Sequence, residues 1–419
     1  MLESLRNMWR IDELRKRILY TLGIFLIIRL GNFIPVPGAN RAAMAQFLEG
    51  QGGLFGLLDA ISGGALANIS IFTLTIGPYI TASIIVSLLQ VIIPAWEKLA
   101  KEGDEGRKKL NEYTRYGTVI LAFIQGFATS AGLATQGVLA SGLANNVLTA
   151  LSFTAGTMMV MWLGELITEK GIGNGISLVI FANIVSQMPR TLAGLGAFVM
   201  EGTVNIFTVV LLGLLALFVI AGVVFVQEGQ RKVPVQYAKR VVGRKMYGGQ
   251  TTHIPLKVNQ AGVIPVIFAS SLLLFPQVIA QFIQHPWAQS IAQVFRFGSA
   301  LHIALYVLFI FVFSYFYTFI QFNPKELAEN MQKHGGAIPG VRPGRVTADF
   351  LFKVVTRLTL VGSLFLVAIV ILPLMLSGVI RMDIGLGGTA LLIVVGVALE
   401  TMKQIEGHLV MRHYSGFMK

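Results

Sequence analysis

Ten long apolar stretches, separated by polar or Gly/Pro-rich breaks, constrain the fold of this 419-residue chain more than any other feature. A helix needs about 20 mostly apolar residues to cross a bilayer core of roughly 30 Å. The stretches are too long for the roughly 10-residue alternating strands of a membrane β-barrel, so an all-α integral membrane protein is predicted. The predicted spans are 18–33, 68–93, 116–138, 146–166, 172–191, 204–227, 258–283, 299–322, 354–380 and 384–404.

Lysine and arginine are unevenly distributed over the connections between these spans. If the N-terminus is cytoplasmic, 28 of the 33 basic residues lie on the cytoplasmic side, and the net charge is +12 inside and +1 outside. This asymmetry follows the positive-inside rule and predicts that both termini are cytoplasmic. The charge reflects orientation and contact with anionic lipid, so it does not by itself indicate nucleic-acid binding. The outer exceptions are Arg29, Arg41, Arg190, Arg296 and Arg381.

Two predicted cytoplasmic connections, 227–257 and 323–353, are longer than turns require. The first has the short apolar alternation and turn residues of a β-hairpin, and the second contains a helix-prone tract. Such loops favour docking of a partner, and a solvated tether is the alternative. The other cytoplasmic segments are the N-terminal residues 1–17 and the tail 405–419.

A short internal match relates the second and seventh spans, which contain PYITAS at 78–83 and PVIFAS at 265–270. Five spans separate the two copies, and an odd number of crossings reverses their direction. The match therefore predicts two inverted five-helix halves, 18–191 and 192–404, with a pathway between them. Chance, or a shared need for proline kinks and small helix contacts, would also produce it.

The segment before the second span is moderately apolar but too short and too glycine-rich to cross a membrane. Asp59 would be costly against lipid, and Gly63 and Gly64 loosen the backbone. We expect a half-helix in a protein-lined, hydrated cavity, and an amphipathic helix at the outer interface is the alternative.

Ionisable residues are nearly absent from the centres of the spans. There is no phosphate-binding GxxxxGK[ST] motif, HExxH pair or nucleophile triad. We therefore expect no enzyme activity, catalytic residue, cofactor or metal site. An ion-coupled secondary transporter with inverted repeats is the alternative to a passive conduit, and the scarcity of charges within the spans argues against it.

Pairs of isoleucines share a helical face near the proline- and glycine-marked ends of three spans. Such stripes are usually bundle core or lipid-facing surface. On the two repeat-matched spans and the glycine-led fifth span, they could instead form an apolar constriction that blocks ions. The pairs are Ile80 and Ile84, Ile176 and Ile180, and Ile264 and Ile267.

The motifs of the chain, taken together, resemble those of the SecY family, the large channel-forming subunit of the bacterial Sec protein translocase and its archaeal and eukaryotic relatives. The resemblance runs from Ile18 to the C-terminus. It is carried by FIPVPG at 33–38, IGPYITASI at 76–84, EGRKKLNEYTRYGT at 105–118, GIGNGIS at 171–177, YAKR at 237–240, THIPLKVNQAGVIPVIFASS at 252–271, NPKELAENMQKHGGAIPGVRPG at 323–344 and ALLIVV at 390–395.

This resemblance implies a clamshell of two halves around an hourglass pore, with functional residues in four groups. The pore ring would be Ile80, Ile84, Ile176, Ile180, Ile264, Ile267 and Ile393. The plug, at about 54–66, would include Leu54, Phe55, Leu57, Leu58, Asp59, Ile61, Gly63 and Gly64. The lateral gate would include Ser83, Ser87, Gln125 and Asn259, the last two bonded across the seam or serving local packing only. Motor or ribosome contacts would be Lys239, Arg240, Arg244, Arg342 and Arg345.

The function implied by the resemblance is translocation of unfolded secretory polypeptides across the bacterial cytoplasmic (inner) membrane, with lateral release of membrane-protein helices into it. Implied partners are SecE-like and SecG-like membrane subunits, a SecA ATPase motor, a translating ribosome, polypeptides that bear signal sequences, and the lipid bilayer. A direct role for nucleic acid is expected only through ribosomal RNA.

Overall fold

The computed structural model describes most of the chain, and every structural statement below concerns that part. The described residues are 11–50, 59, 61–200, 202, 205–237, 240–242, 245–247, 251–282, 299–380 and 388–416.

Ten helices in the described residues coincide with the ten predicted spans, which confirms the all-helical fold class. By length and composition alone, six helices are apolar enough to cross a membrane, and a bent pair makes a seventh. The ten are α2 (Asp12–Gly31), α5 (Gly77–Ile92), α7 (Asp104–Thr135), α8 (Leu143–Lys170), α9 (Gly175–Met200), α10 (Ile206–Glu228), α11 (Ile264–Phe282), α13 (Ala300–Gln321), α15 (Arg345–Ile380) and α16 (Gly388–Gly416).

The second span differs from its prediction at both ends. Residues 68–76 form turns instead of the predicted helix. Ser70 forms a β-bridge with Pro35, and the Thr73 hydroxyl donates to the Ser70 carbonyl, so this stretch of backbone is not helical. Helix α5 begins only at Gly77, with Pro78 in its first turn. At the other end Ile93 is extended before Pro94, and α6 (Pro94–Lys101) leaves at 102°.

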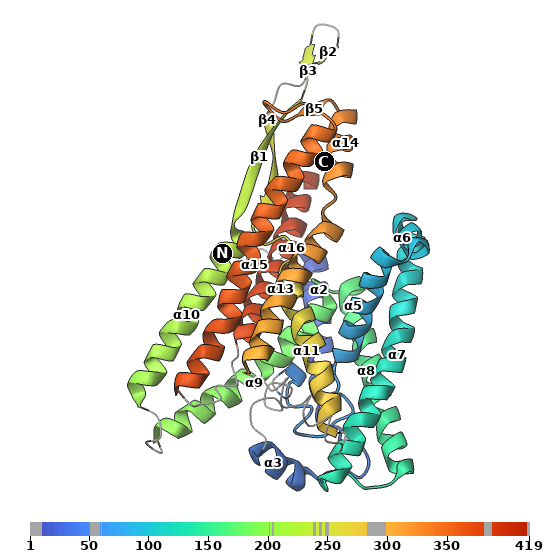
Figure 1. The fold of residues 1–419 in the computed structure, drawn as a ribbon, viewed down its shortest axis with the longest axis vertical. Coiled ribbons are helices and arrows are strands. Elements are labelled where there is room, and N and C mark those ends of the chain that lie inside the picture. The colour runs from blue at the N-terminus through green and yellow to red at the C-terminus, as the bar shows by residue number, and fades with distance from the viewer. Residues whose placement is uncertain are drawn as a thin grey trace.

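The two halves lie side by side, with α10, α13, α15 and α16 on one side and α2, α5, α7 and α8 on the other (Figure 1). Helix α11 lies between them and contacts α13 as well as α5 and α7. A single buried cluster of apolar side chains runs from α2 and α8 through α5, α9 and α11 to α15 and α16, so the main core spans both halves.

The two long connections form one packed unit at one end of the molecule (Figure 1). Strand β1 (Gln230–Tyr237) pairs antiparallel with β4 (Thr251–Lys257), as the hairpin pattern predicts, and also with β5 (Gly336–Ala337) from the second connection. Along the chain, β2 (Arg240–Val242) and β3 (Lys245–Tyr247) come between β1 and β4, and α14 (Pro324–Lys333) precedes β5. Val235, Leu256 and Met331 share a buried cluster, so the two connections pack together rather than form solvated tethers.

At the opposite end, α3 (Arg41–Gly50) covers a second small core. Met44 of α3 packs there with Leu66 and Ile69, which precede α5. This cluster holds the irregular stretch between α3 and α5 in place, and thereby positions the residues that precede α5.

Candidate pore and lateral gate

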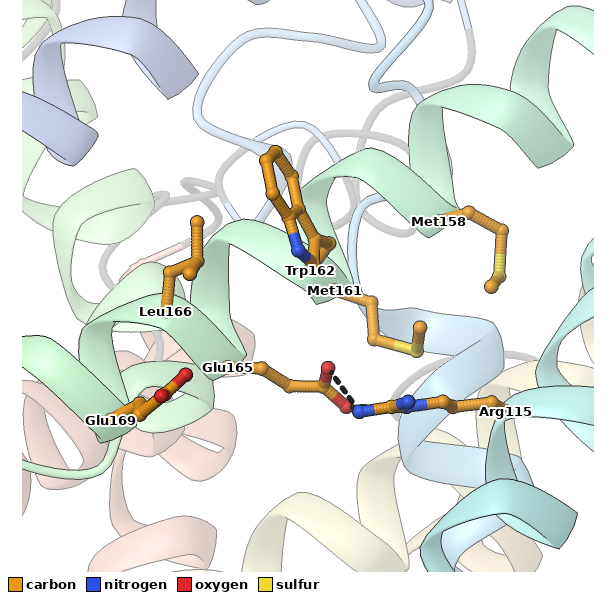
Figure 2. Close-up of a pocket in the computed structure, with 7 residues that line it drawn as sticks. All are labelled: Arg115, Met158, Met161, Trp162, Glu165, Leu166 and Glu169. Carbon is orange, nitrogen blue, oxygen red and sulfur yellow. Dashed lines mark hydrogen bonds and ion pairs between the residues drawn. The ribbon is translucent and has the colours of Figure 1, made fainter.

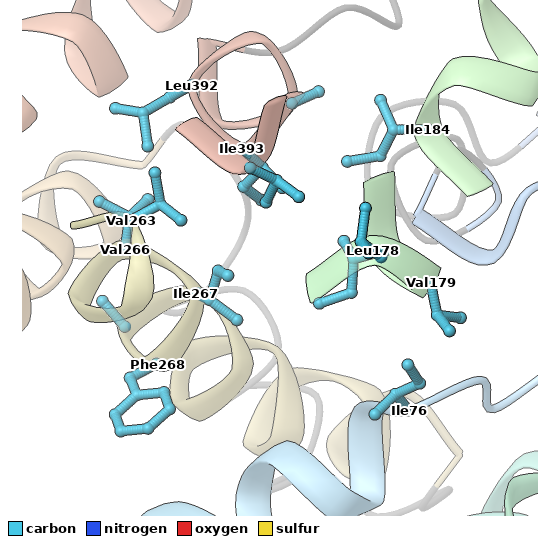
Figure 3. Close-up of a cluster of buried hydrophobic side chains, with 14 of the residues drawn as sticks. Ile76, Leu178, Val179, Ile184, Val263, Val266, Ile267, Phe268, Leu392 and Ile393 are labelled. Carbon is cyan, nitrogen blue, oxygen red and sulfur yellow. The ribbon is translucent and has the colours of Figure 1, made fainter. Parts of the chain in front are cut away.

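The seven isoleucines predicted to form a ring all belong to, or pack against, the buried cluster shared by the two halves. They belong to α5, α9, α11 and α16, and Figure 3 shows two of them, Ile267 of α11 and Ile393 of α16, in the cluster with Leu178 and Ile184 of α9. Ile84, Ile180, Ile267 and Ile393 are buried, with at most 7% of each residue exposed. Ile80, Ile176 and Ile264 are partly buried and pack against the same cluster. This burial contradicts the lipid-facing alternative, and it agrees with a bundle core as well as with a pore ring, which stays a prediction.

A cavity of about 150 Å³ lies at the centre of this arrangement. Four of the isoleucines, one from each contributing helix, line it: Ile80, Ile180, Ile267 and Ile393. The isoleucine side of the cavity offers water few hydrogen-bond partners, so a narrow passage along that side would exclude hydrated ions. Because the four isoleucines come from four separate helices, movement of the halves relative to each other would widen the cavity.

The segment before α5 closes one side of this cavity through Ile61, Ser62 and Leu66. Asp59 turns inward on its own segment, where its Oδ1 accepts a hydrogen bond from the Ala67 amide at 2.8 Å. Four of the predicted plug residues, Leu54, Phe55, Leu57 and Leu58, lie outside the described residues.

Gly63 and Gly64 both have left-handed backbone angles, with φ of 68° and 85°. A Cβ atom at Gly63 would lie 2.9 Å from Oδ1 of Asn183, and one at Gly64 would lie 2.5 Å from Nε2 of Gln187. Glycine is therefore required here by conformation and by the close approach of α9. Asn183 and Gln187 were missed in the sequence because a buried amide in a long apolar helix gives no local sign of its partner.

A seam between the halves runs where α11 meets α5 and α7. Gln125 and Thr129 of α7 and Ser270 and Ser271 of α11 line the central cavity along this seam, so polar side chains from both sides face the same space. The predicted gate residues Ser83 and Ser87, on α5, are half-buried.

The expected hydrogen bond between Gln125 and Asn259 is not formed in the described part of the chain. The Asn259 amide instead donates to the Gly262 carbonyl at 2.9 Å, which closes the turn that leads into α11. This local bond agrees with the local-packing alternative for Asn259. Its amide fits that role because Gly262, with φ of 62°, brings the carbonyl within reach.

Two of the five basic residues predicted to contact a motor or ribosome, Arg342 and Arg345, belong to the second of the two connections. Arg342 and Arg345 are exposed, and the Arg342 carbonyl accepts a hydrogen bond from the Thr347 hydroxyl at 2.8 Å. Arg240 lies on β2 opposite Tyr247 in the register of the β2–β3 pair. Lys239 and Arg244 are outside the described residues.

One carboxylate within the spans, Glu165 of α8, is paired with a cation rather than placed at the central cavity. Nε and Nη2 of Arg115 donate to its two oxygens at 3.0 and 2.8 Å (Figure 2). The pair borders a separate cavity of about 380 Å³, beside Trp162, which is 56% exposed. An ion pair fixed away from the central cavity, near the Lys170 end of α8, does not provide the exchangeable carboxylate that ion coupling would need.

Two apposed helical halves, an apolar constriction between them and a polar-lined seam at its side define a membrane channel. A family model described as SecY matches residues 70–402. The chain belongs to the SecY family.

Relatives of the chain match it over nearly its whole length. A protein named Protein translocase subunit SecY from Halalkalibacterium halodurans is 47% identical, and the match covers 100% of both chains. The protein of the same name from Bacillus subtilis is 45% identical, again over 100% of both chains. The corresponding protein from Thermotoga maritima is 43% identical, and the match covers 100% of this chain and 98% of that one.

Solved structures share the fold at lower sequence identity. One described as "The structure of a protein conducting channel" has a TM-score of 0.68 and 20% identity, over 94% of this chain and 93% of that one. One described as "Sec61 in the Canine ribosome-channel complex from the endoplasmic reticulum" has a TM-score of 0.65 and 18% identity, over 94% and 93% of the two chains.

Proposed function

We propose that this chain is the channel-forming subunit of a bacterial protein translocase, through which unfolded secretory polypeptides cross the cytoplasmic membrane and membrane-protein helices leave sideways. The observation that carries the proposal is the central cavity, where isoleucines from α5, α9, α11 and α16 meet directly beside the α5/α7–α11 seam. A flexible apolar constriction can seal a resting channel against ions and yet yield to a passing chain. The adjoining seam gives an apolar segment a direct route to lipid.

The plug assignment adds a second element to this mechanism. A related solved structure is described as "The plug domain of the SecY protein stablizes the closed state of the translocation channel and maintains a membrane seal". In this chain the equivalent role is proposed for the segment at 54–66, because Ile61, Ser62 and Leu66 close one side of the isoleucine-lined cavity. Translocation would then require the segment to move.

The driving force is proposed to come from a partner on the cytoplasmic side. The unit built from β1, β4, β5 and α14 presents exposed Arg342 and Arg345 on a packed scaffold, which suits an anionic surface on a SecA-like motor or on ribosomal RNA. The uneven distribution of lysine and arginine supports a cytoplasmic location for this unit and for both termini. SecE-like and SecG-like subunits are proposed to complete the complex within the membrane.

A reconstitution assay tests this function. Proteoliposomes would contain the chain with SecE-like and SecG-like subunits, and would receive a SecA motor, ATP and an unfolded secretory precursor. The expected result is ATP-dependent protection of the precursor from added protease. Uptake of a small solute driven by an ion gradient, without precursor protection, would instead identify a secondary transporter and overturn the proposal.

A further inference from the structure

Arg29, near the outer end of α2, joins three separate parts of the molecule. Its Nη1 atom donates to the Gly63 carbonyl at 2.5 Å and to the Ser186 hydroxyl of α9 at 3.3 Å. Its guanidinium also lies 5.0 Å from the centre of the Phe33 ring. An arginine in an apolar span is costly unless its donors are satisfied, so these contacts account for its presence.

Asn32, the residue that follows the last residue of α2, also binds the segment that contains Gly63. This residue is only 1% exposed, and its Nδ2 atom donates to the Ser62 carbonyl at 3.3 Å and the Gly63 carbonyl at 3.5 Å. Both side chains therefore bind main-chain oxygens of the turn at residues 62–64. Such recognition does not depend on which side chains the turn carries.

The opposite side of the 62–64 turn is pressed against α9. The missing Cβ atoms of Gly63 and Gly64 leave the space that Asn183 and Gln187 occupy, as described above. The turn is thus seated between donors at the end of α2 and a close surface on α9. Burial raises the pKa of the Asp59 carboxyl at the start of the segment, and the positive charges of Arg190 and Arg29 partly oppose this rise.

We propose that Arg29 is a positioning residue that latches the 62–64 turn, and with it Ile61 and Leu66, in the docked position beside the isoleucine-lined cavity. The inference rests on the proposed function, in which this segment moves when the channel opens. The latch is reversible because it uses hydrogen bonds to carbonyls. When the turn leaves, Arg29 keeps Ser186 as a partner, and water that enters the opened cavity replaces the Gly63 carbonyl.

The absence of cysteine from the chain permits a direct test of the latch. A single Ser62→Cys substitution introduces one thiol at a position that is only 2% exposed in the docked segment. The complex, in right-side-out membrane vesicles, would be treated with a membrane-impermeant maleimide. Arg29→Met should raise the labelling rate about tenfold, the factor expected for losing a charge-assisted hydrogen bond that holds a locally opening segment. An unchanged rate would overturn the proposal.

Arg41→Gln is the matched control, because Arg41 is also an outer arginine but donates to the Phe33 carbonyl instead of to the turn. Its labelling rate should stay within about twofold of the parent, since an exposed substitution of this kind has little effect on stability. An equal rise in both variants would mean that outer positive charge in general, rather than the latch, controls the segment.

A second reporter separates local release from unfolding. Ser363→Cys on α15 is 1% exposed and remote from the segment, so its thiol should remain protected when only the latch is lost. If Arg29→Met also exposes the thiol of Ser363→Cys, the measurement is repeated with Arg29→Gln in place of Arg29→Met. Loss of protection at both reporter thiols in the Arg29→Gln variant as well would overturn a local role for Arg29. These measurements use neither motor nor substrate, so they hold even if the chain fails to translocate a precursor.

Discussion

Tyr237, the last residue of β1, pairs in antiparallel register with Gly336 of β5, and this pairing joins the two large connections into one sheet. A Cβ atom at Gly336 would lie 3.0 Å from the Tyr237 ring and 3.3 Å from a Val235 methyl group. The joint between the two connections, where Gly336 meets Tyr237, therefore has no room for a side chain at position 336. This joint lies in the unit that carries the exposed basic residues.

Gly336→Val should open this joint. The added methyl groups would overpack the Tyr237 contact and destabilise the local pairing by about 1 to 3 kcal/mol. Limited proteolysis of the complex should then cleave the 227–257 connection faster, and motor-driven translocation should fall. Gly407→Val is the control, because a Cβ atom at Gly407 meets nothing within 4 Å. Equal cleavage rates in both variants would contradict the role given to the joint.

Smaller or polar side chains in the constriction should let ions through the resting channel. Ile84→Gly and Ile180→Ser should each raise the conductance measured in planar bilayers, because water persists more readily beside a polar or smaller lining. Ile120→Ser is the control, since Ile120 is 61% exposed on α7 and faces away from the core. Conductance that stays at the parent level in the two ring variants would show that the isoleucines do not form the seal.

Locking the seam should block sideways exit. Gln125 and Ser271 line the same cavity from α7 and α11, so the pair Gln125→Cys and Ser271→Cys provides two thiols across the seam. A short reducible crosslinker should abolish insertion of a membrane-protein helix, and reduction should restore it. Each single-cysteine variant, treated in the same way, controls for modification alone. Normal insertion through the crosslinked pair would place the exit elsewhere.

The ion pair of Arg115 and Glu165 should contribute to stability and not to transport coupling. Arg115→Met should lower the free energy of unfolding by about 1 kcal/mol or less, because it leaves Glu165 without its bidentate partner in a pair that is largely exposed. The double variant with Glu165→Gln should regain most of this loss, as thermal unfolding of the purified protein would show. If the stable double variant failed to translocate a precursor, transport would require the Glu165 carboxylate. That result would support the ion-coupled transporter.

The sequence correctly predicted the helices and the hairpin because these depend on local properties. The apolar runs predict the ten spans through the transfer of each segment into hydrocarbon, and turn residues predict the β1–β4 pairing. The prediction from the sequence failed where contacts with a distant segment determine the backbone conformation. Residues 68–76 are apolar enough to be helical, yet Ser70 pairs with Pro35, and Ile69 and Thr75 adopt positive φ angles.

The sequence by itself determined that this chain is a multi-pass helical protein with a strong charge asymmetry, a glycine turn before its second span and isoleucines paired on three helices. Only the tertiary structure decided that Ile80, Ile180, Ile267 and Ile393 share one cavity, that Asn259 bonds Gly262, and that Arg29 reaches Gly63. Periodicity specifies which residues share a face of a helix. The partner that each face meets depends on how distant helices pack, and no local pattern encodes that.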